Sequence, residues 1–319
     1  MHNNVCRRSL VLTGPTSGLG LAMAERITCD SRFQPIFLCR NETRREDLRA
    51  RLGDEKARYL VCDFATLSGV RTAATRLCSW LRSEEIAPLG AVVLNAAVHP
   101  GAVSGRTAEG LDATLVTNLI GPHLLVALLS PHVGQHTALN LVFVGSGANS
   151  RRRWWTGLPA TVEPSAETMF EAGALPGPQA YAVSKRATVR LCRAYTARMP
   201  ERTAILSYDP GIMAGTEIAR NMPRISRWVV RKLFPLLTGV DGFSTPQRSA
   251  DWLCDMLARG ALPVGMSYAK VDGFSPAPSI ALDDRAAEDL FDAINAVAGV
   301  TETSTAEWWW DSRDDHLGE

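Results

Sequence analysis

The tyrosine and lysine of the run Tyr181-Ala182-Val183-Ser184-Lys185 carry the clearest chemistry in this chain. If residues 179 to 198 are helical, the i and i+4 spacing places the phenol and the ammonium group on one face. A lysine there favours the phenolate and lowers the pKa of the tyrosine, which eases proton transfer to or from a substrate oxygen. Taken alone, the pair is equally typical of an exposed aromatic ring beside a solvated lysine.

A glycine-rich turn lies far upstream, from Thr13 to Gly20, and strengthens the interpretation of this pair as catalytic. The turn follows an apolar strand and opens a helix, which is the setting in which glycine spacing indicates a dinucleotide site. Glycines allow close approach of the backbone, and the helix N-terminus offers N–H groups to a pyrophosphate. A strand-to-helix turn without a ligand is the alternative. The residues expected at the cofactor are Gly14, Thr16, Ser17, Gly18, Leu19 and Gly20.

The end of the second strand predicts which dinucleotide binds. An NAD-binding protein usually carries an acid there for the ribose 2'-hydroxyl, whereas this chain has Arg40 and Asn41. Arg40 can pair with a 2'-phosphate, so NADP(H) is the predicted cofactor. Arg44 and Arg45 either assist or form the solvated face of the next helix. After the third strand, Asp63 is placed to accept a hydrogen bond from an adenine amino group, or to cap a turn.

Short apolar runs alternate with helical patterns along most of the chain. This alternation predicts an α/β fold of the Rossmann type: a doubly wound parallel sheet of about seven strands with helices on both faces. Because both faces are covered, the runs are apolar throughout rather than alternating. The predicted strands are 9–13, 35–39, 59–62, 91–95, 139–144, 204–208 and 263–268.

Three segments interrupt this repeat. Residues 147–178 are too long for an ordinary connection, and residues 212–245 contain an amphipathic stretch that is either a lid or simple helix packing. We therefore expect one catalytic domain, residues 1–300, in which these two insertions form a substrate loop and a lid. Residues 301–319 form a C-terminal tail with the run Trp308-Trp309-Trp310.

Composition narrows the class of protein. Of the 319 residues, 46% are hydrophobic and 21% charged, so a large core can be buried. A net charge of +1 gives no basic field for nucleic acid. The seven cysteines contain no CxxC pair, the N-terminus carries no targeting segment, and no apolar stretch predicts a membrane span. The cytoplasm is the expected location.

No metal site is expected, because the histidines do not show the spacing of metal ligands. Four histidines are interpreted as structural or exposed: His99, His123, His132 and His136.

These residues together resemble the short-chain dehydrogenase/reductase family, from about residue 8 to about residue 298. Besides the motifs above, the ordered matches are Asn95-Ala96-Ala97, Asn118, Ser146, Pro210-Gly211 and Thr216. The chain is most similar to the branch of retinol dehydrogenases and protochlorophyllide reductases. It departs from that branch in two ways. Ile212 stands where the protochlorophyllide reductases carry a cysteine, and the membrane-anchoring N-terminus frequent in retinol dehydrogenases is not expected here.

The resemblance implies a role for each member of a catalytic tetrad. Tyr181 exchanges a proton with a carbonyl or alcohol oxygen as hydride moves to or from the nicotinamide. Lys185 lowers the Tyr181 pKa and holds the nicotinamide ribose, Ser146 binds the reacting oxygen, and Asn118 anchors a water that links Lys185 to solvent. The residues brought to the cofactor are Asn41, Asp63, Phe64, Asn95, Ala96, Ala97, Tyr181, Lys185, Pro210, Gly211, Ile212 and Thr216. By the same resemblance, a homodimer through the helices that flank the site is an expectation.

The two insertions are expected to supply the walls of the substrate site. Their large apolar side chains indicate a bulky hydrophobic substrate. In the alternative, the same side chains only pack the insertions onto the body. The expected wall residues are Trp154, Trp155, Met213 and Trp228, with Met169, Phe170 and Phe234 as further apolar area.

Three functions remain open from the sequence. The first is an NADP(H)-dependent carbonyl reductase or alcohol dehydrogenase that acts on a bulky apolar small molecule. The second is an NADPH-dependent reductase of a C=C bond. The third is a catalytically silent NADP-binding sensor or partner protein, because fold alone does not establish chemistry.

Overall fold

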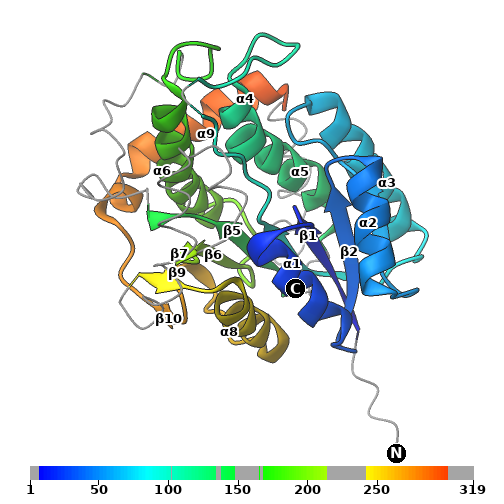
Figure 1. Cartoon of the computed structure of the whole chain (residues 1–319). Coiled ribbons are helices and arrows are strands. Elements are labelled where there is room, and N and C mark those ends of the chain that lie inside the picture. The colour runs from blue at the N-terminus through cyan, green and yellow to red at the C-terminus, as the bar shows by residue number, and fades with distance from the viewer. Residues whose placement is uncertain are drawn as a thin grey trace, which may run out of the picture.

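The computed structural model describes residues 7–101, 103–133, 138–147, 165, 168–213 and 242–300. One eight-stranded sheet runs through the molecule in the order β10-β9-β6-β5-β4-β1-β2-β3 (Figure 1). Its strands are β1 (Arg8–Thr13), β2 (Phe33–Cys39), β3 (Arg58–Val61), β4 (Leu89–Leu94), β5 (Asn140–Val144), β6 (Ala204–Asp209), β9 (Gly265–Lys270) and β10 (Gly273–Phe274). A separate parallel pair is formed by β7 (Ile212–Met213) and β8 (Phe243–Ser244).

The helices cover both faces of this sheet. They are α1 (Gly18–Thr28), α2 (Glu42–Leu52), α3 (Leu67–Arg82), α4 (Ala113–Leu115), α5 (Gly121–Leu129), α6 (Gly177–Thr196), α8 (Pro246–Arg259) and α9 (Asp284–Ala298). A π-helical turn, η1 (Val116–Ile120), joins α4 to α5. Short 3-10 turns are η2 (Ser130–His132) and η7 (Ser279–Leu282).

The predicted fold class is confirmed. The neighbouring strands of the large sheet pair in parallel, except that β10 is antiparallel to β9. The seven predicted strands are present with ends shifted by up to about two residues, as hydrogen-bond-based boundaries usually are. The eighth strand, β10, was not predicted, because Gly273 and Phe274 are too few residues to show a periodic pattern.

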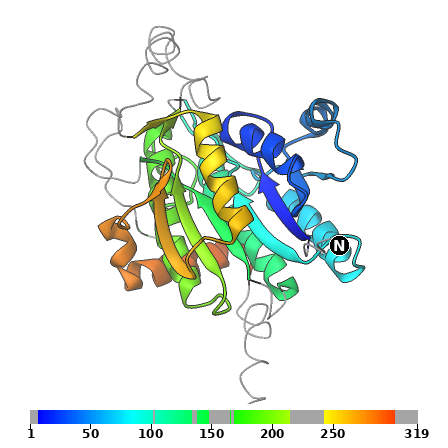
Figure 2. The ribbon, with the colours of Figure 1, turned by 90° about the horizontal axis from the view of Figure 1, so that it is seen from below.

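Alternate side chains of each strand enter two separate cores. Val11 of β1 joins the core beneath α3, α5, α6 and α9, whereas Leu10 and Leu12 join the core beneath α1, α2 and α8. This division follows from the two-residue period of a strand, which sends successive side chains to opposite faces. Figure 2 shows α1 and α8 side by side on one face of the sheet. The catalytic candidates on α6 therefore belong to the opposite layer.

One helical run, Ala113–His132, has the length and composition of a membrane span. The expectation that no apolar stretch would reach this length is therefore wrong. Most of its apolar window is buried inside the molecule, where α3, α6 and α9 pack against it. A core helix buried on all sides is apolar all round for the same reason that a membrane helix is.

Candidate functional site

The tyrosine and lysine of α6 are buried side by side. Only 5% of Tyr181 and 4% of Lys185 is exposed, so the interpretation as an exposed ring beside a solvated lysine is wrong. The Lys185 Nζ lies 5.8 Å from the centre of the Tyr181 ring, as the helical spacing predicted. The same Nζ donates a hydrogen bond of 2.9 Å to the carbonyl oxygen of Val144, the last residue of β5. This bond ties the catalytic helix to the carboxyl end of the central strands.

Ser146 follows β5 by two residues and reaches the phenol of Tyr181 through a side-chain hydrogen bond. The serine is half-buried, so the pair lies at the boundary between the core and the space above the strand ends. Parallel α/β sheets bind their ligands at this edge, because the strand ends leave a crevice there. The sequence-predicted serine and tyrosine are therefore brought together.

Burial controls the protonation of both α6 groups. It raises the pKa of Tyr181 to about 12, although the Ser146 hydrogen bond opposes the rise and the charge of Asp209 adds to it. Burial also lowers the pKa of Lys185 to about 8, against the attraction of Asp209. The pKa of Tyr181 is therefore raised rather than lowered, because desolvation of the phenolate is the largest effect on it. At neutral pH Tyr181 is a phenol and Lys185 is still mostly a cation.

Asp209 is a third charge near this pair that the sequence analysis missed. It ends β6, is only 3% exposed, and its Oδ1 accepts a hydrogen bond of 3.1 Å from the Gly211 amide. A signal was available in the sequence, since an acid at the end of a parallel strand must lie at the ligand edge of the sheet. Its charge raises the pKa of both Lys185 and Tyr181.

Asn118 lies in the π-helical turn and is almost fully buried. Its Oδ1 accepts from the Val98 amide at 2.8 Å, and its Nδ2 donates to the Val98 carbonyl at 3.0 Å. The same Nδ2 donates to the Ser184 hydroxyl at 3.1 Å, which in turn donates to the Tyr181 carbonyl. Asn118 therefore clamps the segment after β4 to the catalytic helix; the role of water anchor stays a prediction.

The glycine turn has the shape that a dinucleotide phosphate requires. Gly14 and Gly18 adopt φ values of +64° and +53°. A Cβ on Gly20 would lie 2.1 Å from the Gly14 carbonyl oxygen, so only glycine fits. Ser17, the N-cap of α1, makes no side-chain cap bond, which leaves first-turn N–H groups for an anion. Such a cradle fits a nicotinamide dinucleotide.

Asn95 holds this turn from the neighbouring strand end. Its Nδ2 donates to the carbonyl oxygens of Thr13 and Gly14, both at 3.0 Å. The Thr13 hydroxyl accepts from the amides of Asn95 and Ala96, at 2.9 and 2.8 Å. The predicted Asn95-Ala96-Ala97 motif is therefore beside the cofactor turn, and its first member supports the turn's backbone.

The basic and acidic residues predicted for the adenosine end contact one another or the glycine turn. Arg40 is exposed, with its Nε 3.6 Å from the Asp63 Oδ2. Asp63 also accepts from the Ala65 amide at 3.0 Å, which is the turn-capping role that was left open. Arg44 reaches the glycine turn through a bond of 3.2 Å from its Nη1 to the Thr16 hydroxyl. A second guanidinium therefore lies at the glycine turn.

The remaining adenosine-side predictions have structural contacts. Asn41 caps α2 by accepting a hydrogen bond of 3.0 Å from the Arg44 amide. Phe64 is buried beneath Gly121, where a Cβ would lie 2.9 Å from the Phe64 carbonyl oxygen. Leu19 is buried in the core beneath α1. One of the three is thus a helix cap and the other two are core side chains.

The predicted substrate walls are only partly placed. Gly211 has φ +76°, and Ile212 and Met213 form β7, with Met213 packed against the core beneath α1 and α8. Met169 and Phe170 are buried in the opposite core. Their expected role as wall residues is therefore wrong, because they pack inside the protein. The predictions for Trp154, Trp155, Thr216, Trp228 and Phe234, and for the tail 301–319, fall outside the described residues.

A doubly wound sheet with a phosphate turn and a buried Tyr/Lys pair at its ligand edge defines an oxidoreductase of the dinucleotide-binding class. Residues 8–157 match the model of the short chain dehydrogenase family. A dehydrogenase/reductase SDR family member 13 of Bos taurus is 30% identical over 311 residues, spanning 94% of this chain and 75% of the relative. The chain belongs to the short-chain dehydrogenase/reductase family, whose members use a nicotinamide cofactor.

Two further comparisons agree with this assignment. A chloroplastic protochlorophyllide reductase of Cucumis sativus is 30% identical over 236 residues, which span 66% of this chain and 57% of the relative. A short chain dehydrogenase from Burkholderia cenocepacia, solved in complex with NADP, superposes with a TM-score of 0.60 at 18% identity. That superposition covers 85% of this chain and 98% of the solved chain. The predicted resemblance to the retinol dehydrogenase and protochlorophyllide reductase branch is confirmed.

Proposed function

We propose that this chain is an NADP(H)-dependent oxidoreductase that reduces a carbonyl group of a bulky hydrophobic small molecule, with Tyr181 as the general acid. One observation carries the proposal: a buried, protonated phenol hydrogen-bonded to Ser146 at the ligand edge of the sheet. Reduction requires a proton donor, and a phenol whose pKa is raised to about 12 is protonated across the physiological range.

The side chains divide the proton chemistry between them. A bound nicotinamide supplies the hydride. Tyr181 donates its proton to the substrate oxygen, while Ser146 hydrogen-bonds the same oxygen as negative charge develops on it. The Lys185 ammonium stabilises the phenolate that Tyr181 leaves behind, and Asp209 helps to keep Lys185 charged. The same groups in reverse would oxidise an alcohol.

The direct test is Tyr181→Phe, which removes the phenol oxygen and keeps the ring. Turnover of NADPH with a panel of ketones and aldehydes should fall by about 100-fold or more, in line with the loss of general acid catalysis. The Kd for NADPH should change little. Tyr59→Phe is a matched control, since it removes a hydroxyl on the distant strand β3. Full turnover by Tyr181→Phe would end the proposal.

The preference for NADP(H) is proposed from Arg40, whose exposed guanidinium stands where an NAD site has an acid. Arg40→Asp should weaken NADPH binding by about 10-fold or more, because a pairing charge becomes a repelling one. NADH binding should be unchanged or improved. Arg51→Asp makes the same change of charge at the far end of α2 and should alter neither Kd. Equal NADPH affinity in Arg40→Asp and the wild type would refute the preference.

A second candidate is reduction of a C=C bond, favoured by the similarity to protochlorophyllide reductase. Tyr181 would then protonate a carbon rather than an oxygen. Ile212 stands where the protochlorophyllide reductases carry a cysteine, which argues against the light-driven form of that reaction. Product mass together with loss or retention of the carbonyl absorbance separates the two reductions. Tight NADPH binding without turnover of either substrate class would instead favour a sensor.

A further inference from the structure

His99 lies directly against the catalytic tyrosine, although the sequence analysis interpreted it as structural or exposed. The centres of the His99 and Tyr181 rings are 4.5 Å apart, and the ring planes are tilted by 48°. This separation is at the short end of the range for interacting aromatic rings. The imidazole comes from the segment after β4, whereas the phenol comes from α6, so only the fold brings them together.

The imidazole is held in place by its own segment. The His99 Nδ1 lies 2.7 Å from the carbonyl oxygen of Pro100. Because a carbonyl only accepts, Nδ1 carries the hydrogen and Nε2 is an acceptor in the neutral ring. Val98, the residue before His99, has both its amide and its carbonyl bound by Asn118. The ring of His99 and the backbone of the residue before it are therefore both held.

Asn118 ties the two rings to a common support. It binds Val98 on the His99 side and the hydroxyl of Ser184 on the Tyr181 side. Ser184 in turn donates to the Tyr181 carbonyl at 2.7 Å. A shift of the segment after β4 would therefore move the His99 ring relative to the phenol. The contact is part of a connected hydrogen-bonded unit.

The charges around this contact favour a neutral imidazole. Burial lowers the pKa of His99 below its ordinary value, so the ring is uncharged at neutral pH. The Lys185 ammonium stands 5.8 Å from the Tyr181 ring centre, and the carboxylate of Asp209 acts on both Tyr181 and Lys185. A neutral ring packs beside the phenol without competing with Lys185 for the phenolate charge.

We propose that His99 is a positioning residue that holds the Tyr181 ring in the rotamer in which its hydroxyl meets Ser146. This inference rests on the proposed role of Tyr181 as the proton donor. The phenol oxygen is the atom of the side chain farthest from the backbone, so a small rotation about the Cα–Cβ bond moves it most. A displacement of about 1 Å at a reacting group can cost about 100-fold in rate.

The first test reads the ring contact without using activity. The chain has five tyrosines, and 3-fluorotyrosine labelling makes each visible by fluorine NMR; Tyr181→Phe identifies the Tyr181 resonance. In the labelled wild type, an NOE between His99 ring protons and the Tyr181 fluorine is expected. His99→Ala should shift and broaden that resonance, because the ring current is lost and the phenol samples more than one rotamer. An unchanged Tyr181 resonance in His99→Ala would overturn the inference.

The second test separates positioning from substrate contact. His99→Ala should lower kcat by about 10- to 100-fold with KM and the NADPH Kd within about twofold. His99→Phe keeps a ring against Tyr181 and should retain most of kcat. An unchanged kcat in His99→Ala, or an equal loss in His99→Phe, contradicts positioning by the ring. His132→Ala is the control for removing an imidazole away from the site.

The two proposals fail in different ways. If Tyr181→Phe retains turnover, the proposed function fails whatever the NMR contact shows. If Tyr181→Phe is inactive while His99→Ala turns over like the wild type, only the positioning role fails.

Discussion

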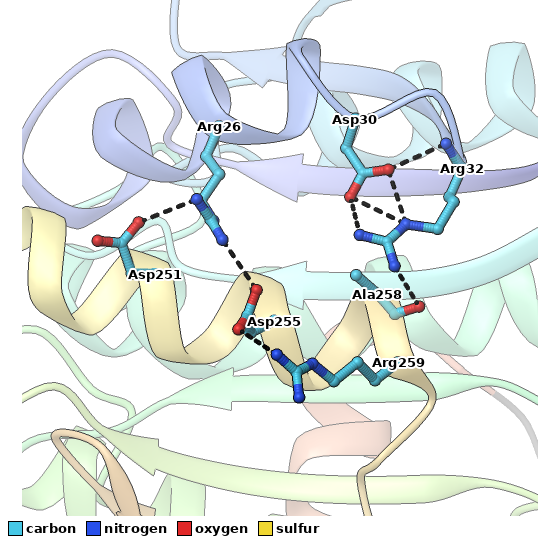
Figure 3. A network of polar contacts seen from close by, with 7 residues as sticks. All are labelled: Arg26, Asp30, Arg32, Asp251, Asp255, Ala258 and Arg259. Atoms are coloured by element: carbon cyan, nitrogen blue, oxygen red, sulfur yellow. Dashed lines mark hydrogen bonds and ion pairs between the residues drawn. The ribbon is translucent and has the colours of Figure 1, made fainter.

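The two faces of the sheet place their polar groups differently. On the α1 and α8 face, charged side chains form an exposed network across the two helices (Figure 3). Arg26 contacts Asp251 at 3.3 Å and Asp255 at 2.8 Å, and Arg259 contacts Asp255 at 3.2 Å. Further along, Arg32 pairs with Asp30 and donates to the Ala258 carbonyl oxygen. All these pairs are open to solvent.

The α5, α6 and α9 face also has exposed ion pairs, Arg193 with Asp284 and Arg198 with Glu288, but a set of hydrogen-bonded polar groups lies beneath them. His123 is fully buried; its Nε2 lies 2.8 Å from the Asn295 Oδ1, and its Nδ1 lies 2.8 Å from the Tyr195 hydroxyl. The rings of Tyr195 and Phe291 enclose the imidazole. One residue from each of the three helices therefore joins a hydrogen-bonded set centred on the buried His123, and α6 also carries Tyr181.

Exposed and buried polar contacts hold the helices in place with different strength. Exposed ion pairs contribute about 0–1 kcal/mol each, because water and salt screen them. A buried polar group left without its partner costs about 1–3 kcal/mol. The α6 face is therefore specified by interactions that are expensive to break. The α1 face tolerates changes in its exposed charged network, but it is sensitive where backbone atoms crowd the cofactor turn.

The largest expected effect is on stability in acid and arises from His123. Burial lowers the pKa of His123 to about 4 from an ordinary value of 6.5. Between these values the unfolded chain binds a proton that the folded chain does not, so the free energy of unfolding falls as the pH falls. The slope from His123 is about 1.4 kcal/mol per pH unit. Urea unfolding of the wild type between pH 7 and 4 measures it.

His123→Gln sharpens this test because it removes the titrating ring. The variant should be less stable at pH 7, yet its unfolding free energy should depend on pH less steeply by about the same 1.4 kcal/mol per unit. The pH slope of its unfolding free energy should therefore be shallower than that of Asp255→Asn, a variant on the other face. Identical pH slopes for His123→Gln and the wild type would show that the buried face does not behave as described.

The next effect is on cofactor binding through the turn before α1. Gly20→Ala places a Cβ 2.1 Å from the Gly14 carbonyl oxygen and 2.5 Å from the Asn95 Nδ2. The backbone must shift to relieve this overlap, which displaces the phosphate-binding turn. We expect this to weaken NADPH binding by about 1–3 kcal/mol, or to raise the Kd by about 5- to 150-fold. Gly273→Ala is the control, since nothing lies within 4 Å of its added Cβ. Isothermal titration calorimetry measures the NADPH Kd of the two variants. Equal Kd values would contradict the expected crowding at Gly20.

The smallest effect is expected from the exposed network. Asp255→Asn weakens contacts to both Arg26 and Arg259, whose side chains are 45% and 68% exposed. The unfolding free energy should fall by less than about 1 kcal/mol, and the loss should shrink in high salt. Denaturation at low and high salt measures this change. A loss above about 2 kcal/mol would mean that the two faces are not as different as proposed.

Most of the fold and the central pair of the site were predictable from local pattern. Apolar runs marked the strands, the glycine turn marked the start of α1, and the Tyr181 to Lys185 spacing marked one face of α6. The pKa of Tyr181 was not predictable. Its direction depends on how completely the phenol is desolvated, and the packing of other segments decides that burial.

The contacts that the sequence pattern did not predict join residues that are far apart in the chain. His99 reaches Tyr181, Asp209 acts on Lys185, and Asn295 binds His123, although none of these pairs is close along the chain. Met169 and Phe170 show the reverse case, since their apolar character indicated a pocket wall and they are core. Hydrophobicity alone does not distinguish these two destinations.

The order of residues was enough to predict the class of fold, the glycine turn and the Tyr181/Lys185 pair, because each depends on the spacing of a few neighbouring residues. Tertiary structure alone decided the protonation of that pair, the ring that packs against the phenol and the face that holds α6. These properties depend on burial and on distances between segments, which the order of residues does not state.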